Sequence, residues 1–237
     1  MIYIRFRHLL VIAAMMIIAV LLIFFRLTEE NVKPVLGGMP HTVYVIDAGH
    51  GGEDGGAVAP DGTVESGINL SIASRLDGLL TLLGDTCVMT RTEDRAIYDS
   101  SAKTIREKKV SDIKNRVALV NQIPNSLLIS IHQNMLPSHP DVFGAQVFYA
   151  PNEASRRRAS VMQQQLNQTI NGEKNKQEKP ATSSIYLLNH IETPGVLIEC
   201  GFLSNPDETR KLKSDAYQKL LAITIAAGIQ KSEGVTQ

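Results

Sequence analysis

The stretch VYVIDAGHGGEDGGAV, Val43 to Val58, starts as a β-strand and continues as a glycine-rich loop. Valine, tyrosine and isoleucine are enriched in strands, so residues 43–47 predict a buried strand. Five glycines then surround His50. Glycine has no Cβ, so the chain can turn sharply and a ligand can come close to the backbone. The glycine spacings of nucleotide-binding loops are absent, so the loop indicates a site built around the histidine rather than a phosphate cradle.

Strand-like and helical segments alternate along the rest of the chain. Further apolar runs of strand length lie at residues 86–91, 127–132, 145–150 and 195–202. Apolar residues at three-to-four spacing predict helices at 68–83 (closed by Gly84), 113–120, 161–168 and 216–231. This order predicts an α/β fold, with a mostly parallel central sheet sandwiched by helices in a single catalytic domain. In such a fold, functional residues gather at the carboxyl ends of the strands.

The N-terminal region carries an unbroken apolar run from Leu9 to Phe25, with arginines on both flanks. At about 1.5 Å per residue, a helix of this length just spans a hydrocarbon core of about 30 Å. A cleaved signal peptide is the alternative, but its apolar core is usually about 7–15 residues and ends at a small-residue site that is missing here. The sequence therefore predicts an N-terminal transmembrane anchor at 1–26, a linker at 27–41 and a catalytic domain at 42–237, exported to the outer face of the membrane.

The overall composition excludes one class of partner. Lysine and arginine number 24, as do aspartate and glutamate, so the net charge is zero and nothing indicates nucleic-acid binding. Cys87 and Cys200 lie in apolar runs without a CxxC spacing, which predicts buried free thiols. Three consecutive arginines, 156–158, indicate a solvated helix face, and the polar stretch 171–184 indicates an exposed loop.

Three residues with metal-binding side chains occupy comparable places in the predicted elements. His50 follows the first strand, His132 ends the third, and Glu65 begins the helix after the glycine-rich loop. Each alone has a structural explanation, such as a hydrogen-bonded strand-end histidine or a glutamate that suits the helix dipole. Together they form the ligand set of a catalytic zinc ion with one open position. Their spacing is not HExxH, so the pattern by itself leaves both interpretations open.

Glu199 lies inside the apolar run GVLIECGF, residues 195–202. A carboxylate is costly there unless it is paired or has a function. Burial would raise its pKa toward the range that suits a general acid and base. The structural alternative is an ion pair with Arg91 or Arg116.

Several sequence pieces occur in an order that resembles a known family. They are DAGHGGEDGGA, the glutamate at 65, VMTRTED, IKNRVALVN, SIHQN and TPGVLIECGFLSNP. The chain is similar over nearly all of residues 43–230 to the zinc-dependent N-acetylmuramoyl-L-alanine amidases, the Amidase_3 family. The resemblance implies that Zn²⁺ is the cofactor, that His50, Glu65 and His132 are its ligands, and that Glu199 is the catalytic residue.

The chain departs from the usual family pattern at three positions. Ala48 stands where a proline commonly precedes the Gly-His pair, Ser66 where a lysine commonly follows the ligand glutamate, and Met135 where alanine follows SIHQN. None of these changes removes a ligand. They bear on substrate preference and loop rigidity.

The resemblance implies a peptidoglycan hydrolase that cleaves the amide between the lactyl group of N-acetylmuramic acid and the L-alanine of the stem peptide. A single catalytic domain behind an N-terminal anchor is similar to the germination-specific amidases of spore formers. Those enzymes act in cortex maturation before muramic lactam forms, which would place this chain between the mother-cell and forespore membranes. Two alternatives stay open: another zinc-dependent peptidase or deacetylase of the cell wall, and a catalytically silent, anchored peptidoglycan-binding scaffold. The sequence leaves undecided whether a protein partner completes the site.

Overall fold

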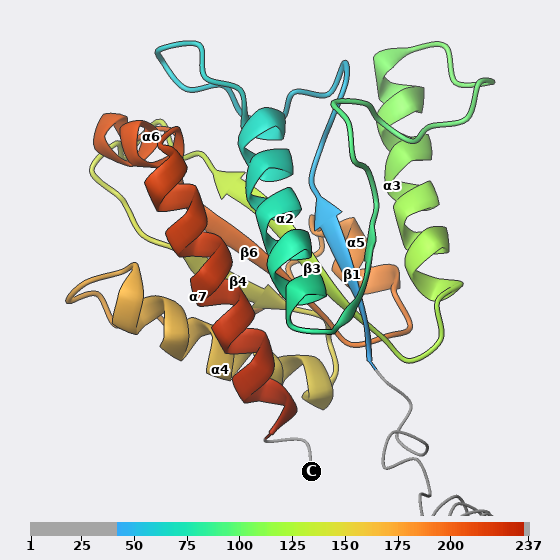
Figure 1. Ribbon diagram of the computed structural model, residues 1–237. Helices are drawn as coiled ribbons and strands as arrows, with labels where there is room; N and C mark the ends of the chain where they lie inside the picture. Colours follow the sequence, from blue (N-terminus) through green and yellow to red (C-terminus); the bar gives the residue numbers. More distant parts are fainter. Residues whose placement is uncertain (1–41, 235–237) are drawn as a thin grey trace, which may run out of the picture. The chain divides into compact units, whose positions relative to one another are not determined.

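Six strands among the described residues, 42–234, form one sheet in this computed structural model (Figure 1). Their order across the sheet is β2-β1-β3-β6-β4-β5. The strands are β1 (Val43–Ala48), β2 (Thr86–Met89), β3 (Ser126–Asn134), β4 (Gln146–Tyr149), β5 (Lys179–Pro180) and β6 (Gly195–Phe202). The apolar runs in the sequence therefore predict all the strands except the two-residue β5.

The sheet is mostly parallel, as the sequence predicts, but one antiparallel pair makes it mixed. Strand β1 pairs in parallel with β2 and β3, β3 with β6, and β4 with β5, but β4 runs antiparallel to β6. A parallel return needs a crossover of a dozen or more residues, usually a helix. The segment between β3 and β4 covers residues 135–145 and has no helix, so β4 returns in the opposite direction.

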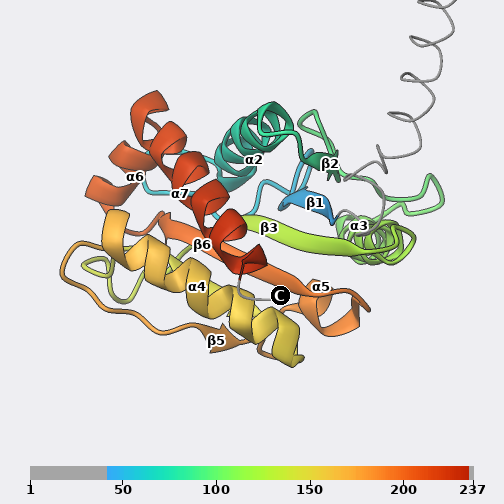
Figure 2. The same ribbon diagram turned by 60° about the horizontal axis from the view of Figure 1, so that its bottom comes forward.

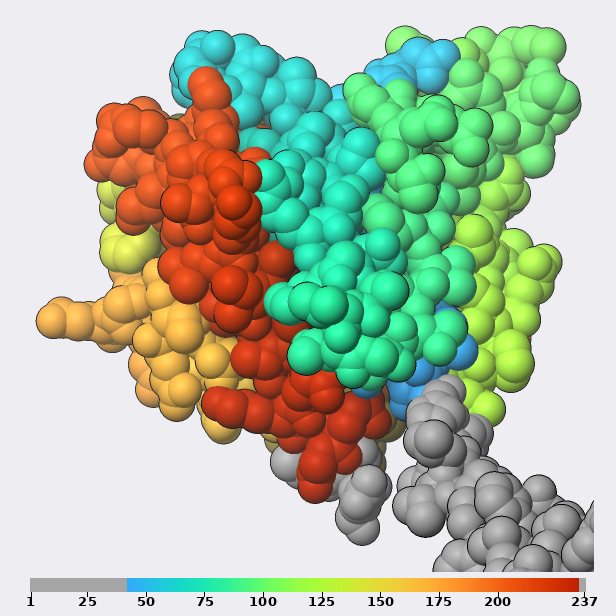
Figure 3. Space-filling model, viewed as in Figure 1, coloured from blue at the N-terminus to red at the C-terminus, as the bar shows by residue number. Residues whose placement is uncertain are grey.

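Helices cover both faces of the sheet (Figures 1 and 2). The helices are α2 (Glu65–Leu82), α3 (Ile105–Asn121), α4 (Glu153–Thr169), α5 (Tyr186–His190), α6 (Pro206–Leu212) and α7 (Asp215–Glu233). On one face α7 contacts both α2 and α4, and Figure 3 shows α2 and α7 side by side on the surface. On the other face α3 contacts α5, and residues of both helices pack against Val45, Leu128 and Leu197 of the sheet.

The end of α2 follows its sequence signal. Gly84 has a φ of +92°, a left-handed conformation that glycine adopts without steric cost. Its N–H donates to the carbonyl of Thr81, and the N–H of Asp85 donates to the carbonyl of Leu80. These two bonds form a Schellman motif, which satisfies the last carbonyls of the helix.

Several local predictions need correction. Helix α3 includes the charged region before residue 113, because Thr104 and Glu107 form a capping box that starts the helix at Ile105. The buried stripe of α4 contains Met162 and Leu166, while the positions 161, 165 and 168 are only partly buried or exposed. Stretch 171–184 is not simply an exposed loop, since it supplies β5 and begins with the buried Asn171. The short helices α5 and α6 were not predicted.

The predictions for the cysteines, the consecutive arginines and the membrane anchor have different outcomes. Both cysteines are free thiols, as predicted, although Cys87 is only partly buried. Arg156 and Arg157 pair with Glu153 on the exposed side of α4, which confirms a solvated face for these two, but Arg158 is partly buried and pairs with Glu233 of α7. No helix within residues 42–234 is both long and apolar enough to cross a membrane. The predicted anchor at 1–26 lies outside the described residues.

Candidate metal centre

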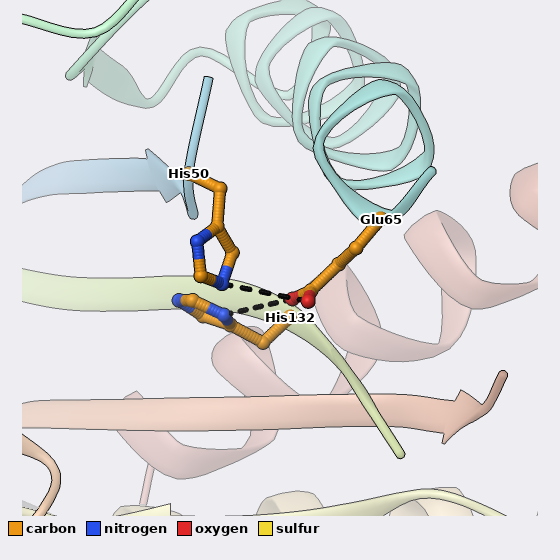
Figure 4. A group of neighbouring side chains, drawn as sticks. All are labelled: His50, Glu65 and His132. Carbon is orange, nitrogen blue, oxygen red and sulfur yellow. Dashed lines mark hydrogen bonds and ion pairs between the residues drawn. The ribbon is translucent and has the colours of Figure 1, made fainter. Parts of the chain in front are cut away.

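Three side chains from separate elements converge at one end of the sheet (Figure 4). His50 follows β1, Glu65 is the first residue of α2, and His132 lies on β3. The Nε2 atom of His50 is 3.4 Å from Oε2 of Glu65, and Nδ1 of His132 is 3.0 Å from Oε1. The structure thus brings together the three residues that the sequence singled out. His132 lies two residues before the strand end, because β3 continues to Asn134.

The Glu65 carboxylate is held in place from several sides. Its Oε1 accepts hydrogen bonds from the backbone N–H of Gln133 and from Nδ2 of Asn69, and its Oε2 accepts one from the N–H of Ala57. Burial alone would raise the pKa of Glu65, but the hydrogen bond from His132, the two histidine charges and the Ala57 N–H outweigh it and lower the pKa to about 2. The carboxylate is therefore ionised and oriented toward the two imidazoles.

His50 has an unusual backbone and a fixed ring. Its φ of +61° is in the left-handed region, which non-glycine residues rarely adopt and which recurs at functional sites. Nδ1 lies 2.8 Å from Oδ2 of Asp54, and Oδ1 of Asp54 lies 2.7 Å from Nζ of Lys109 on α3. If Nδ1 donates its hydrogen to Asp54, a carboxylate bound in this way leaves Nε2 free to bind a metal, the usual arrangement around ligand histidines.

The glycines around His50 make room for protein side chains. A Cβ on Gly49 would lie 2.1 Å from Cε1 of the His132 ring, and a Cβ on Gly56 would lie 2.5 Å from Oε2 of Glu65. The sequence predicts that this space admits a ligand. Instead, the imidazole and the carboxylate of the site itself fill it, so glycine is needed for the three side chains to meet.

A buried ionic network lies beneath the loop. Arg116 of α3 is 1% exposed, contacts the carboxylates of Asp47 and Asp112, and donates to the backbone carbonyl of His50. Arg91 donates to the carbonyls of Ala48 and Gly49. Burial alone would raise the pKa of Asp47, but Arg116 and further partners lower it to about 2. The network holds the strand end that carries His50.

Glu199 lies beside these three residues, and no arginine of the described region, 42–234, pairs with it. It is aligned with His132 across the β3–β6 pair, and its Oε2 is buried without a hydrogen-bond partner among the described residues. Burial, followed by the Glu65 charge, raises its pKa to about 7, although both histidines oppose the change. Arg91 and Arg116 are used by the loop network, so the ion-pair alternative for Glu199 is wrong.

The geometry of the three side chains fits a zinc ion. Tetrahedral zinc with bonds of about 2.0–2.2 Å separates its ligand atoms by about 3.3 Å. His50 Nε2 lies 3.4 Å from Oε2 of Glu65 and His132 Nδ1 lies 3.0 Å from Oε1, the other carboxylate oxygen. One ligand atom from each of the three residues lies within 4.8 Å of the others. Two imidazole nitrogens and one carboxylate oxygen also form a donor set that zinc accepts while leaving a position open.

Comparison with known proteins agrees with this arrangement. The profile of the N-acetylmuramoyl-L-alanine amidase family matches residues 45–231, more than three quarters of the chain. The chain belongs to this family. The amidase is 34% identical over 202 residues to the germination-specific N-acetylmuramoyl-L-alanine amidase of Bacillus subtilis, covering 85% of this chain and 84% of that one.

Solved structures of similar proteins share the fold of the amidase. The CwlD amidase of Clostridioides difficile, solved in complex with the GerS lipoprotein, has a TM-score of 0.78 and 36% identity, covering 82% of this chain and all of that one. The amidase AmiC2 of Nostoc punctiforme has a TM-score of 0.71 and 29% identity, covering 83% of this chain and 99% of that one.

Several residues of the amidase site were not predicted from sequence. Asp54 contacts His50, Asn69 contacts Glu65, and Arg116 supports the loop from α3. Asp54 has a readable signal, because it stands four residues after His50 in the same glycine-rich loop. Asn69 also has a signal in the sequence, because it stands four residues after Glu65. Residues four apart on a helix are neighbours, so its amide can reach the Glu65 carboxylate.

Proposed function

We propose that the amidase uses Zn²⁺ held by His50, Glu65 and His132, with Glu199 as its general base and acid. The amidase hydrolyses the amide between N-acetylmuramic acid and L-alanine in peptidoglycan, the reaction that defines its family. The observation that carries the proposal is the meeting of three ligand atoms within 4.8 Å beside the buried Oε2 of Glu199, for which residues 42–234 supply no hydrogen-bond partner.

Each proposed residue has a separate part in the reaction. Zinc in such a site acidifies water and polarises the amide carbonyl. Glu65 supplies the negative charge of the ligand set, and the Asp54 carboxylate orients the imidazole of His50. Glu199 accepts the proton of the attacking water on its free Oε2 and passes it to the nitrogen of L-alanine as that nitrogen leaves. Burial raises the pKa of the Glu199 carboxyl in the metal-free protein, which favours a group that accepts a proton and later returns it.

The cellular role is the second part of the proposal. Likeness to a germination-specific amidase over most of both chains supports a role in spore cortex maturation, ahead of muramic lactam formation. The apolar run at 9–25 supports a membrane anchor with the catalytic domain outside the cytoplasm. The relative whose structure was solved in complex with a lipoprotein supports a protein partner for this chain as well. N-terminal sequencing of membrane-extracted protein tests the anchor, and a mature chain that starts after residue 26 would contradict it.

Digestion of purified peptidoglycan by the full-length protein in detergent tests the chemistry. The protein is stripped of metal, and digestion is compared with and without added zinc by mass analysis of the released fragments. We expect zinc-dependent release of stem peptides with a free L-alanine amine. Free glucosamine amines would instead identify a deacetylase, and binding without any released fragment would identify a silent scaffold.

A further inference from the structure

A groove of about 530 Å³ lies next to the proposed zinc site, at the side of the sheet where β4 and β5 lie. Its lining includes Asn134, Gln146, Phe148, Lys176, Lys179 and Phe202. None of the residues that form the metal centre lines this groove. Its two lysines, Lys176 and Lys179, have no part in the chemistry described above.

The groove is continuous with the catalytic residues along one face of the sheet. Gln146 of β4 is aligned with Glu199 of β6, and Asn134 follows His132 by two residues on β3. Because Gln146 and Glu199 are directly opposite each other in the antiparallel β4–β6 pair, their side chains lie on the same face of the sheet. A peptide whose first amide bond lies at Glu199 can therefore continue over β4 toward β5.

Two lysines give the groove its charge. Lys176 and Lys179 line it, and none of the described lining residues is acidic. Nζ of Lys176 donates to the carbonyl of Gly144 at 2.5 Å and lies 5.1 Å from the centre of the Phe202 ring. Burial lowers the pKa of Lys176 to about 8, even though Glu208 raises it. An anion bound at this position would stabilise the partly desolvated ammonium group.

The segment that carries the lysines is held in position. Asn167 of α4 donates to the carbonyl of Lys176 at 2.8 Å, and the buried Gln146 donates to the carbonyl of Gln177 at 2.6 Å. Lys179 is aligned with Phe148 in the short β4–β5 pair. Because the backbone is fixed at these points, both lysines line the groove from a preformed wall.

We infer that this groove binds the stem peptide beyond L-alanine and that Lys176 and Lys179 select stems whose carboxylates are free over stems whose carboxylates are amidated. The inference rests on the proposed amidase reaction. Neighbouring strands are about 4.8 Å apart, so β5 lies about 10 Å from β6, while an extended peptide advances about 3.4 Å per residue. The second and third residues of the stem therefore reach the lysines, where a free carboxylate on either residue would supply the matching charge.

The test compares two soluble N-acetylmuramoyl-tripeptides that differ only in whether their carboxylates are free or converted to primary amides. For the zinc-loaded full-length protein, we expect kcat/KM to be about tenfold or more higher for the free form, the size of one hydrogen bond between charged groups. In Lys176→Gln and Lys179→Gln this ratio should fall toward one. Lys179→Arg, which keeps the charge, should retain most of the preference.

Lys219→Gln is the matched control, because it removes the same charge from α7, where Lys219 pairs with Asp215. It should keep the parental ratio. Equal rates on both peptides in the parent, or a preference that survives in the variant lacking both groove lysines, would overturn the inference. Thermal melting of each variant verifies that it is folded.

Failure of the amidase reaction itself has a different signature, since neither peptide would then be cleaved. In that case, calorimetric titration of the same two peptides into Glu199→Gln protein decides the matter. Binding about tenfold tighter for the free form, lost in the lysine variants, supports the groove even without turnover. Equal dissociation constants for the two forms would reject it.

Discussion

Replacing Glu199 by glutamine should make the metal-free protein more stable at high pH while abolishing catalysis. The pKa of Glu199 is raised by burial from its ordinary 4.5 to about 7. Between these values the folded protein binds a proton that the unfolded chain has lost, so the free energy of unfolding falls as the pH rises from 4.5 to 7. Above pH 7 the folded protein holds an ionised carboxylate whose Oε2 finds no hydrogen-bond partner in the described part of the chain. Glutamine cannot ionise and avoids this cost.

The shift in pKa sets the size of the effect. A change from 4.5 to about 7 corresponds to at most about 3 kcal/mol, and solvent at the partly exposed side chain reduces this to about 1–3 kcal/mol. For a domain of this size, that range corresponds to a melting temperature about 3–10 °C higher for Glu199→Gln at pH 8. At pH 5 the parental side chain is protonated in the folded state, so most of the difference should disappear.

Thermal unfolding in EDTA at pH 5 and pH 8 measures this difference for the parent and the variant. Glu192→Gln serves as the control, because Glu192 is exposed and its replacement should give the same small change at both pH values. A Glu199→Gln effect that is the same at pH 5 and pH 8 would refute the electrostatic argument. With zinc restored, the variant should bind its metal, but its rate should be lower by a factor of about 10²–10⁴, which is the usual contribution of a positioned general base. More than about a tenth of the parental rate in a folded, zinc-loaded variant would refute the catalytic assignment.

Three further changes test the construction of the site. His132→Ala should lose both zinc and activity because one of three ligands is missing, whereas the exposed His139→Ala should keep both; metal analysis of the purified proteins decides this. Gly49→Ala should weaken zinc binding and lower the melting temperature, because its Cβ would occupy the position of the His132 ring, while Gly78→Ala, which has open space in α2, should be neutral or stabilising by up to about 1 kcal/mol. Asp54→Asn should reduce zinc affinity about 10–100-fold in a competition titration with a chelator, and an unchanged affinity would exclude it as the residue that orients the first histidine ligand.

Local patterns in the chain were enough to predict much of the fold. Strands β1, β3 and β6 appear as apolar runs because they are buried on both faces, and α2 ends at Gly84 because only a left-handed residue closes a Schellman motif easily. The ligand residue types were also readable, since each stands next to an element boundary or within a strand-like run. Their assignment to zinc, however, depended on family resemblance, because their spacing in the chain is irregular.

Tertiary contacts decided what these patterns could not express. The direction of β4 depends on a connection without a helix, and Glu199 is left without an arginine because Arg116 is used by Asp47 and Asp112. The sequence alone did not explain why residue 49 is a glycine. In the structure, the ring of His132, 83 residues further along the chain, occupies the space that a Cβ at residue 49 would need. The lysine-lined groove likewise arises because a polar stretch pairs with β4 at the sheet edge. Such contacts join residues far apart in the chain, and periodicity within a short window carries no information about which distant side chain will fill a given space.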